Sequence, residues 1–236
     1  MSRTLRSVVV LWCAVLCLSG NALFALDSAT AVVPVPVSGT FPLAGIDQID
    51  HDLQIDLFQR GAEGAPDTLL ETLSFRGRMT IERGDPYISS SGFREVSFVV
   101  TRWEATAWSN ALGSMVVYRL SPGAQPPSYI TAETRTSDYP ATFDFNLYFD
   151  ATAYGMILIE RHHGRPKGHG FMEVPPSGNR PTSPTITSFE PYVIEGEHPQ
   201  YGTIYFRPRN CNDSGSQTLH TYTAAEKASL KLPQGR

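Results

Sequence analysis

The chain has 236 residues, of which 41% are hydrophobic and 18% are charged. This composition excludes a disordered chain, because the apolar residues suffice for a packed core. The 19 basic and 23 acidic residues give a net charge of −4, which excludes the strong positive field of a non-specific nucleic-acid-binding protein. We therefore expect one or two folded domains and no nucleic-acid partner.

The first residues have the order of a secretory signal peptide. Arg3 and Arg6 precede an uncharged apolar run, Val8–Leu18, which is too short to span a bilayer stably. Gly20 and Ala22 are small and fit the recognition positions of a signal peptidase, so we place the cleavage after Ala22. The alternative is an N-terminal membrane anchor or a buried helix. The pattern favours secretion, periplasmic or extracellular, with no membrane span after cleavage.

The predicted mature chain must be stabilised by packing. The leader contains two Arg and no acid, so its removal leaves 17 basic and 23 acidic residues, a net charge of −6. It also takes away Cys13 and Cys17. Cys211 alone cannot form an intramolecular disulfide. The neighbouring Asn212 begins an Asn-x-Ser pattern and is a candidate glycosylation site.

Two segments early in the mature chain have the period of β-strands. Apolar and polar residues alternate in Ile49–Leu57 and again in Leu73–Glu82. The first segment has an acidic face and the second a partly basic one, so we expect them to pair antiparallel. We interpret Asp50, Asp52 and Asp56 as a solvated strand face. A calcium site is less favoured, because the spacing lacks the central Gly of an EF-hand loop.

Further strands follow at the spacing of a β-sandwich. They are predicted at Arg94–Glu104, Ser114–Leu120, Tyr129–Arg135, Thr142–Asp150, Met156–Glu160, Thr185–Glu190 and Thr203–Arg207. The alternation is clearest in Thr142–Asp150. Near the C-terminus, Thr223 and Glu226 fit a capping box before a short helix, Lys227–Leu232, which ends at Pro233.

Proline and glycine between these runs argue against long helices. The predicted fold class is therefore all-β, an antiparallel β-sandwich of about 8–10 strands with a short C-terminal helix. We divide the chain into a signal peptide (1–22), an extended lead-in (23–40), a single sandwich domain (41–222) and a C-terminal tail (223–236).

Several landmarks between residues 85 and 176 resemble those of a known group of proteins. They are Asp85-Pro86-Tyr87, Pro127-Ser128-Tyr129, Tyr139-Pro140-Ala141 leading into Phe143-Asp144-Phe145, and Pro175-Pro176. Together they resemble a β-rich domain found in secreted bacterial proteins of unknown function. The resemblance implies export and a β fold. It implies no activity, so it supplies no catalytic residue.

The most unusual segment is Arg161–Gly170, which concentrates histidines and cations after a predicted strand. We interpret it as a solvated basic loop. Its candidate metal ligands are His162, His163 and His169. A zinc or copper site is less favoured, because no nearby Asp, Glu or Cys completes a known ligand spacing. Its candidate anion contacts are Arg161, Arg165 and Lys167, which suit an acidic glycan or a phosphate.

Aromatic residues are the second candidate for a binding surface, because flat rings match the apolar faces of sugars. The candidates are Trp103, Trp108, Tyr118, Tyr129, Tyr139, Tyr148, Tyr154, Tyr192, Tyr201 and Tyr205. We expect most of them to pack in the core, since aromatics at alternate positions are ordinary in β domains.

The sequence carries no motif of the common hydrolase, metalloprotease, phosphate-binding or dinucleotide-binding sites. We therefore predict a non-catalytic structural or binding module of the cell envelope or extracellular space, with no cofactor. Polysaccharide and envelope protein are the expected partner classes. The alternatives are a carbohydrate-binding module that uses exposed aromatics, and a hydrolase or metal-dependent enzyme that uses residues 161–170.

Overall fold

The described part of the chain is built from β-strands and one short helix. The computed structural model describes residues 39–153, 156–175, 185–188, 194–230 and 232. By its internal contacts the chain divides into Met1–Val35, outside the described residues, and Pro36–Arg236, which contains all the strands described below. The elements are β1 (Gly45–Gln59), β2 (Thr68–Arg83), β3 (Tyr87–Ile88), β4 (Arg94–Ser109), β5 (Ser114–Leu120), β6 (Ser128–Ala132), β7 (Ala141–Asp144), β8 (Leu147–Ala153), β9 (Met156–Gly164), β10 (Lys167–Phe171), β11 (Thr185–Ser188), β12 (Ile194–His198), β13 (Gly202–Thr221) and α1 (Ala224–Lys227).

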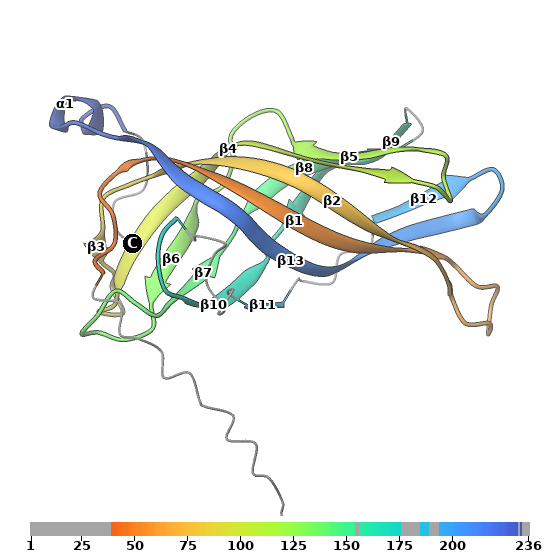
Figure 1. Cartoon of the computed structure of the whole chain (residues 1–236), viewed down its shortest axis with the longest axis horizontal. Coiled ribbons are helices and arrows are strands. Elements are labelled where there is room, and N and C mark those ends of the chain that lie inside the picture. Colours follow the sequence, from red (N-terminus) through yellow and green to blue (C-terminus); the bar gives the residue numbers. More distant parts are fainter. Residues whose placement is uncertain (1–38, 154–155, 176–184, 189–193, 231, 233–236) are drawn as a thin grey trace, which may run out of the picture. The chain divides into compact units, whose positions relative to one another are not determined.

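The strands form a sheet with a main path and a branch (Figure 1). Along the path the order is β11-β10-β7-β6-β4-β2-β1-β13-β12, and the branch leaves β4 through β5 to β8 and β9. The sheet curls strongly into a half-barrel, and its inner face carries the hydrophobic core. The prediction of an all-β antiparallel fold is confirmed.

The described strands form a single 13-stranded sheet, where the sequence predicted a sandwich of two sheets. The length of β4 explains the difference. Its first half pairs with β6 over Glu95–Phe98, and its second half pairs with β5 over Glu104–Ser109. One strand therefore joins the path to the branch, so the two groups of strands do not separate into independent sheets.

β1 and β2 pair antiparallel, as their alternation predicts. The register places His51 opposite Gly77 and Asp50 opposite Arg78. Arg78 Nε lies 2.6 Å from Asp50 Oδ1, which is the cross-strand charge pair expected from the sequence. Side chains of directly opposed residues point to the same face of a sheet. The buried odd-numbered residues of β1, such as Ile49 and His51, therefore share the inner face with Gly77.

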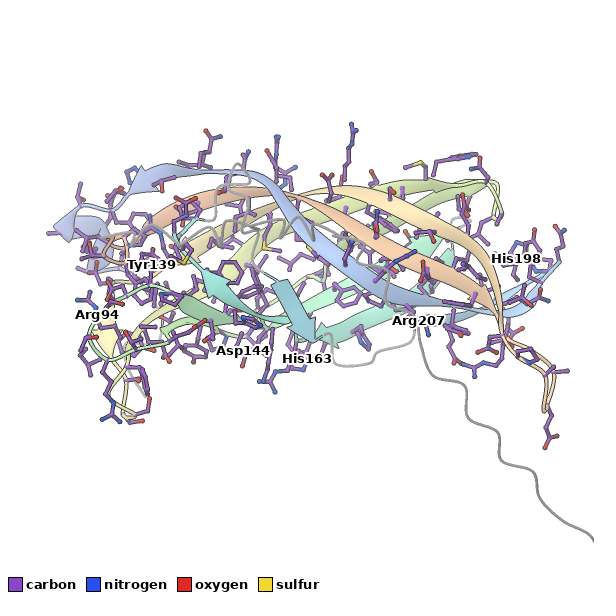
Figure 2. All side chains as sticks on the ribbon, turned by 60° about the horizontal axis from the view of Figure 1, so that its bottom comes forward. Arg94, Tyr139, Asp144, His163, His198 and Arg207 are labelled. Atoms are coloured by element: carbon purple, nitrogen blue, oxygen red, sulfur yellow. The ribbon has the colours of Figure 1, made fainter. Side chains whose placement is uncertain are left out.

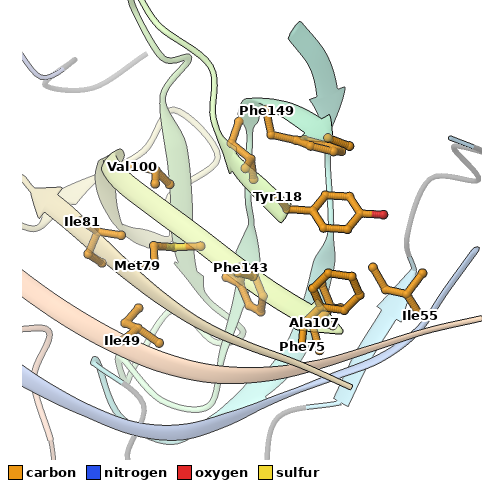
Figure 3. Close-up of a cluster of buried hydrophobic side chains, with 14 of the residues drawn as sticks. Ile49, Ile55, Phe75, Met79, Ile81, Val100, Ala107, Tyr118, Phe143 and Phe149 are labelled. Atoms are coloured by element: carbon orange, nitrogen blue, oxygen red, sulfur yellow. The ribbon is translucent and has the colours of Figure 1, made fainter. Parts of the chain in front are cut away.

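Apolar and aromatic side chains fill the inner face (Figure 3). Met79 comes from β2, Val100 from β4, Tyr118 from β5 and Phe149 from β8, and all four are buried. Burying one side chain of this size contributes about 1.5–3 kcal/mol to the free energy of unfolding. Packing of this kind is what the predicted mature chain requires, because its single cysteine cannot form an internal disulfide.

The segment with the clearest predicted alternation, Thr142–Asp150, is divided between β7 and β8. The interruption lies at Phe145 and Asn146, whose backbone N–H groups leave the strand ladder. The Phe145 N–H donates to the Pro166 carbonyl, and the Asn146 N–H donates to Ser128 Oγ at 2.8 Å. The alternation of apolar and polar side chains therefore continues through Phe145 and Asn146, although the backbone pairing stops between β7 and β8.

The prediction of a loop at Arg161–Gly170 is wrong. This segment supplies the end of β9 and most of β10, because its residues pair with β8 and with β7. The predicted strand Thr203–Arg207 is only the first part of β13, which follows β1 with three register shifts. Long-range pairing extends both segments beyond what their own sequence patterns indicate.

The predicted capping box at the C-terminal helix is confirmed. The Thr223 N–H donates to Glu226 Oε2 at 2.7 Å, and the Glu226 N–H donates to Thr223 Oγ1 at 3.4 Å. The helix ends at Lys227, earlier than predicted, and the Lys227 ammonium lies 2.7 Å from Asp85 Oδ1. No helix in the described residues is both long enough and apolar enough to cross a membrane.

Candidate functional site

The inner face contains a buried histidine that crosses a neighbouring strand. Trp103 Nε1 on β4 donates to His51 Nε2 on β1 at 2.9 Å. The strand between them contributes Gly77, and a Cβ at that position would lie 2.3 Å from His51 Nε2 and 2.9 Å from the Ala105 Cβ. Glycine therefore leaves the space that the imidazole needs to reach the indole.

A chain of ring contacts continues from this histidine across the inner face. The centroid of Trp103 lies 6.2 Å from that of His51 and 5.7 Å from that of Phe149, which in turn lies 5.2 Å from that of His162. Tyr118 contacts both Trp103 and Phe149. Figure 3 shows Tyr118 and Phe149 within the core. The rings thus connect β1, β4, β5, β8 and β9 into one aromatic cluster.

Burial keeps the two histidines of this cluster uncharged near neutral pH. Burial lowers the pKa of His51, and this effect exceeds the opposing influence of the Ile49 carbonyl and of the carboxylates of Asp52 and Asp50. Burial also lowers the pKa of His162, and the neighbouring His163 lowers it further. A neutral His51 whose Nε2 accepts a hydrogen bond carries its proton on Nδ1. The ring therefore acts as an internal hydrogen-bond acceptor for Trp103.

A second buried polar group is an ion pair at the other end of the inner face. Arg83 Nε lies 2.7 Å from Asp47 Oδ2, and Arg83 NH2 donates to Asp47 Oδ1 at 3.1 Å. Their side chains are 1% and 0% exposed. Thr218 Oγ1 also donates to Asp47, at 2.8 Å. The pair links β1, β2 and β13, which gives it a structural role.

The three candidate metal ligands are not brought together. His162 packs on Phe149, while the ring of the adjacent His163 lies 5.1 Å from that of Tyr148. Successive residues of a strand point to opposite faces. His169 is exposed on β10. Within the described residues, no group of three or more His, Cys, Asp or Glu side chains could hold a metal ion.

The candidate anion contacts that the structure describes share one carboxylate. Arg165 NH2 lies 3.1 Å from Asp144 Oδ2, and Lys167 Nζ lies 3.7 Å from the same oxygen. Asp144 and His163 are both labelled in Figure 2. The side chain of Arg161 lies outside the described residues. Asp144 thus offsets one of the two positive charges, which weakens the attraction of this segment for an anion.

Other sequence candidates lie on strands. Asn212 is opposite Asp52 on β13, with its side chain outside the described residues, so glycosylation there stays a prediction. Asp50 and Asp52 are at least partly accessible, as predicted for a solvated face, but Asp56 is buried. Asp56 Oδ1 accepts from Thr72 Oγ1 at 2.7 Å and faces Arg209 NH1 at 3.7 Å. The prediction of a fully solvated acidic face is therefore wrong at Asp56.

Among the described aromatic residues only Trp108 is exposed; Tyr154 and Tyr192 lie outside the described residues. Trp108 is opposite Met115 on β5, and the two residues are 56% and 43% exposed. The sequence named Trp108 among ten aromatics but gave no reason to choose it. It placed Gly77 on the apolar side of a strand but did not identify it as part of a site, because its only signal was a glycine inside an alternating strand.

The comparisons with known proteins give one structural likeness. The solved structure of DynF from the dynemicin biosynthesis pathway of Micromonospora chersina is similar to this chain with a TM-score of 0.48 and 15% sequence identity. The match covers 80% of this chain and 88% of that one. No protein-family model and no curated protein matches the chain.

Proposed function

We propose that the chain is a non-catalytic binding module of the cell envelope or extracellular space. The observation that supports this proposal is that buried ionisable groups of the inner face are held by fixed partners. Arg83 Nε donates a hydrogen bond to Asp47 Oδ2, and Trp103 Nε1 donates one to His51 Nε2. A catalytic acid, base or nucleophile must reach a substrate atom, and these enclosed groups do not. Recognition is therefore expected on the outer residues and turns of the sheet.

The leader supports the export part of the proposal. Arg3 and Arg6 followed by Val8–Leu18 have the order of a signal peptide. A rigid sheet that presents residues and turns to a partner is a common design for binding modules. The function proposed here rests on the site and the leader, and takes nothing from the structural likeness.

The test is to mix the purified mature chain with isolated cell-envelope material of its source organism. Co-sedimentation and the release of soluble products are measured across protein concentrations. We expect saturable binding with no released sugar, peptide or lipid. Product that increases in proportion to the protein added would contradict the non-catalytic role, and binding that does not saturate would contradict the binding role.

A further inference from the structure

Trp108 and Met115 form an exposed apolar patch on the outer face of the β4–β5 hairpin. They are directly opposite each other, with exposures of 56% and 43%. Opposed residues of an antiparallel pair have Cβ atoms about 4.5–5.5 Å apart. The indole and the thioether therefore lie next to each other on the same side of the sheet.

On β4 and β5, the positions next to this patch are uncharged. The next pair on the same face of the two strands is Thr106 with Val117. Four neighbouring positions on this face thus carry no charge, although Glu104 and Arg119 form the pair beyond them. On the β2 side of the patch, the exposed Arg76 is directly opposite Thr106. One exposed cation adds only a little to the binding of an anion. The patch is suited to a neutral ligand that combines an apolar face with hydroxyl groups.

The hairpin that carries Trp108 is held in a fixed geometry. Glu71 on β2 accepts hydrogen bonds from Ser109 Oγ at 2.8 Å, from the Ala111 N–H at 3.2 Å, and from the Asn110 N–H and Nδ2 at 3.2 and 3.1 Å. These bonds fix the turn that directly follows Trp108. A ring held in place before binding loses less conformational entropy when a ligand packs on it.

The size of the patch argues against a protein partner. A stable protein interface buries about 800 Å² on each side and uses roughly 20–30 residues. Here two large apolar side chains are exposed together. A single pyranose ring is similar in size to an indole. The C–H groups on one side of the sugar carry partial positive charge, which suits the negative face of an aromatic ring.

We propose that Trp108 is the stacking residue of a binding site for one pyranose unit of a neutral polysaccharide, with Met115 at its edge. This inference rests on the proposed binding function and names its ligand class. One ring without an enclosing pocket gives little binding energy. Single sugar units should therefore bind with a Kd of about 1 mM or weaker, and attachment should be measurable on an insoluble polymer.

The experiment measures co-sedimentation of the mature chain with microcrystalline cellulose, chitin and insoluble xylan. The variants are Trp108→Ala, Trp108→Tyr and the control Ile88→Ala. Ile88 is also exposed, at 64%, but lies on β3. We expect the unmodified chain and Ile88→Ala to bind at least one polymer equally. Trp108→Ala should bind at least about tenfold more weakly, and Trp108→Tyr should retain part of the binding because its ring can still stack.

Three outcomes would overturn this inference and leave the proposed function standing. The first is equal polymer binding by the unmodified chain and Trp108→Ala. The second is binding to envelope material without binding to any neutral polymer. The third is self-association, or binding to phosphatidylcholine vesicles, that Trp108→Ala abolishes. Loss of saturable binding to envelope material as well would overturn the proposed function itself. Circular dichroism of each variant establishes that it is folded.

Discussion

At the scale of single residues, the most demanding position is Gly77. It is opposite His51, whose ring passes over it to accept the hydrogen bond of Trp103. The sequence period placed His51 on the apolar side of a strand and Gly77 on the matching side of its neighbour. It did not show that one side chain uses the space left by the other, because that depends on the register between two strands.

Replacing Gly77→Ala should lower the free energy of unfolding by about 1–3 kcal/mol, the usual cost of overfilling a packed core. The new Cβ would lie 2.3 Å from His51 Nε2 and 2.6 Å from His51 Cε1. In a His51→Ala background both contacts are gone, so the same replacement should cost less. Urea unfolding of the two single variants and the double variant measures this coupling. Additive effects within about 0.3 kcal/mol would contradict it.

At the scale of elements, Glu71 fastens β2 to the β4–β5 turn. Backbone pairing between β2 and β4 covers Arg76–Arg83 of β2, and beyond it Glu71 makes the connection through its side chain. Burial raises the pKa of Glu71, but the hydrogen bonds from Ser109, Ala111 and Asn110 outweigh it, so the pKa lies below its ordinary value of 4.5. The ionised carboxylate is therefore the form that stabilises the turn.

Glu71→Gln should lower the free energy of unfolding at neutral pH by about 1–3 kcal/mol, because an ionised acceptor is lost from a set of hydrogen bonds. A group whose pKa is lowered by folding stabilises above its ordinary pKa, and this contribution is lost as the pH falls through the folded value. The difference between the variant and the unmodified chain should thus shrink below about pH 4.5. Thermal unfolding between pH 7 and pH 3 measures it, with Glu63→Gln as the exposed control. A difference independent of pH would argue against the ionised carboxylate.

The sequence predicted elements best where local pattern and long-range pairing agree. β1, β2 and the capping box at Thr223 follow directly from period and cap chemistry. The full length of β13 does not follow from the sequence pattern. Its later residues alternate poorly between apolar and polar, and they pair with β1 only with register shifts. The prediction of a loop at Arg161–Gly170 was wrong for a similar reason. Glycine and proline indicate turns locally, whereas pairing with β7 and β8 decides the outcome.

At the scale of the whole molecule, the buried pair of Arg83 and Asp47 fixes three strands at one end of the sheet. Asp47 belongs to β1, Arg83 to β2, and Thr218 of β13 donates to the same carboxylate. The sequence could not predict that Trp108 is the exposed aromatic of the candidate site on the outer face, because its exposure depends on how the entire sheet curls. Sequence alternation indicates which residues share a face, but not how much of each is covered.

Asp47→Asn or Arg83→Met should each lower the free energy of unfolding by about 3–5 kcal/mol, because the remaining partner is buried without a counter-charge. The double variant Asp47→Leu with Arg83→Met should lose less than the two single losses together. Asp50→Asn, at the solvent-exposed pair with Arg78, should change little. Chemical denaturation measures all four. A single-variant loss as small as that of Asp50→Asn would show that the buried pair does not stabilise the sheet.

The pairing of β1 with β13 places Gly45 opposite Thr221. Among the described strands, the first in chain order is therefore paired with the last. A nascent chain therefore carries β1 with one edge unpaired until β13 has been synthesised. Open strand edges attract other chains. Chaperones that mask this strand edge would consequently matter most late in synthesis. A chain truncated before Gly202 should form aggregates instead of a shortened fold.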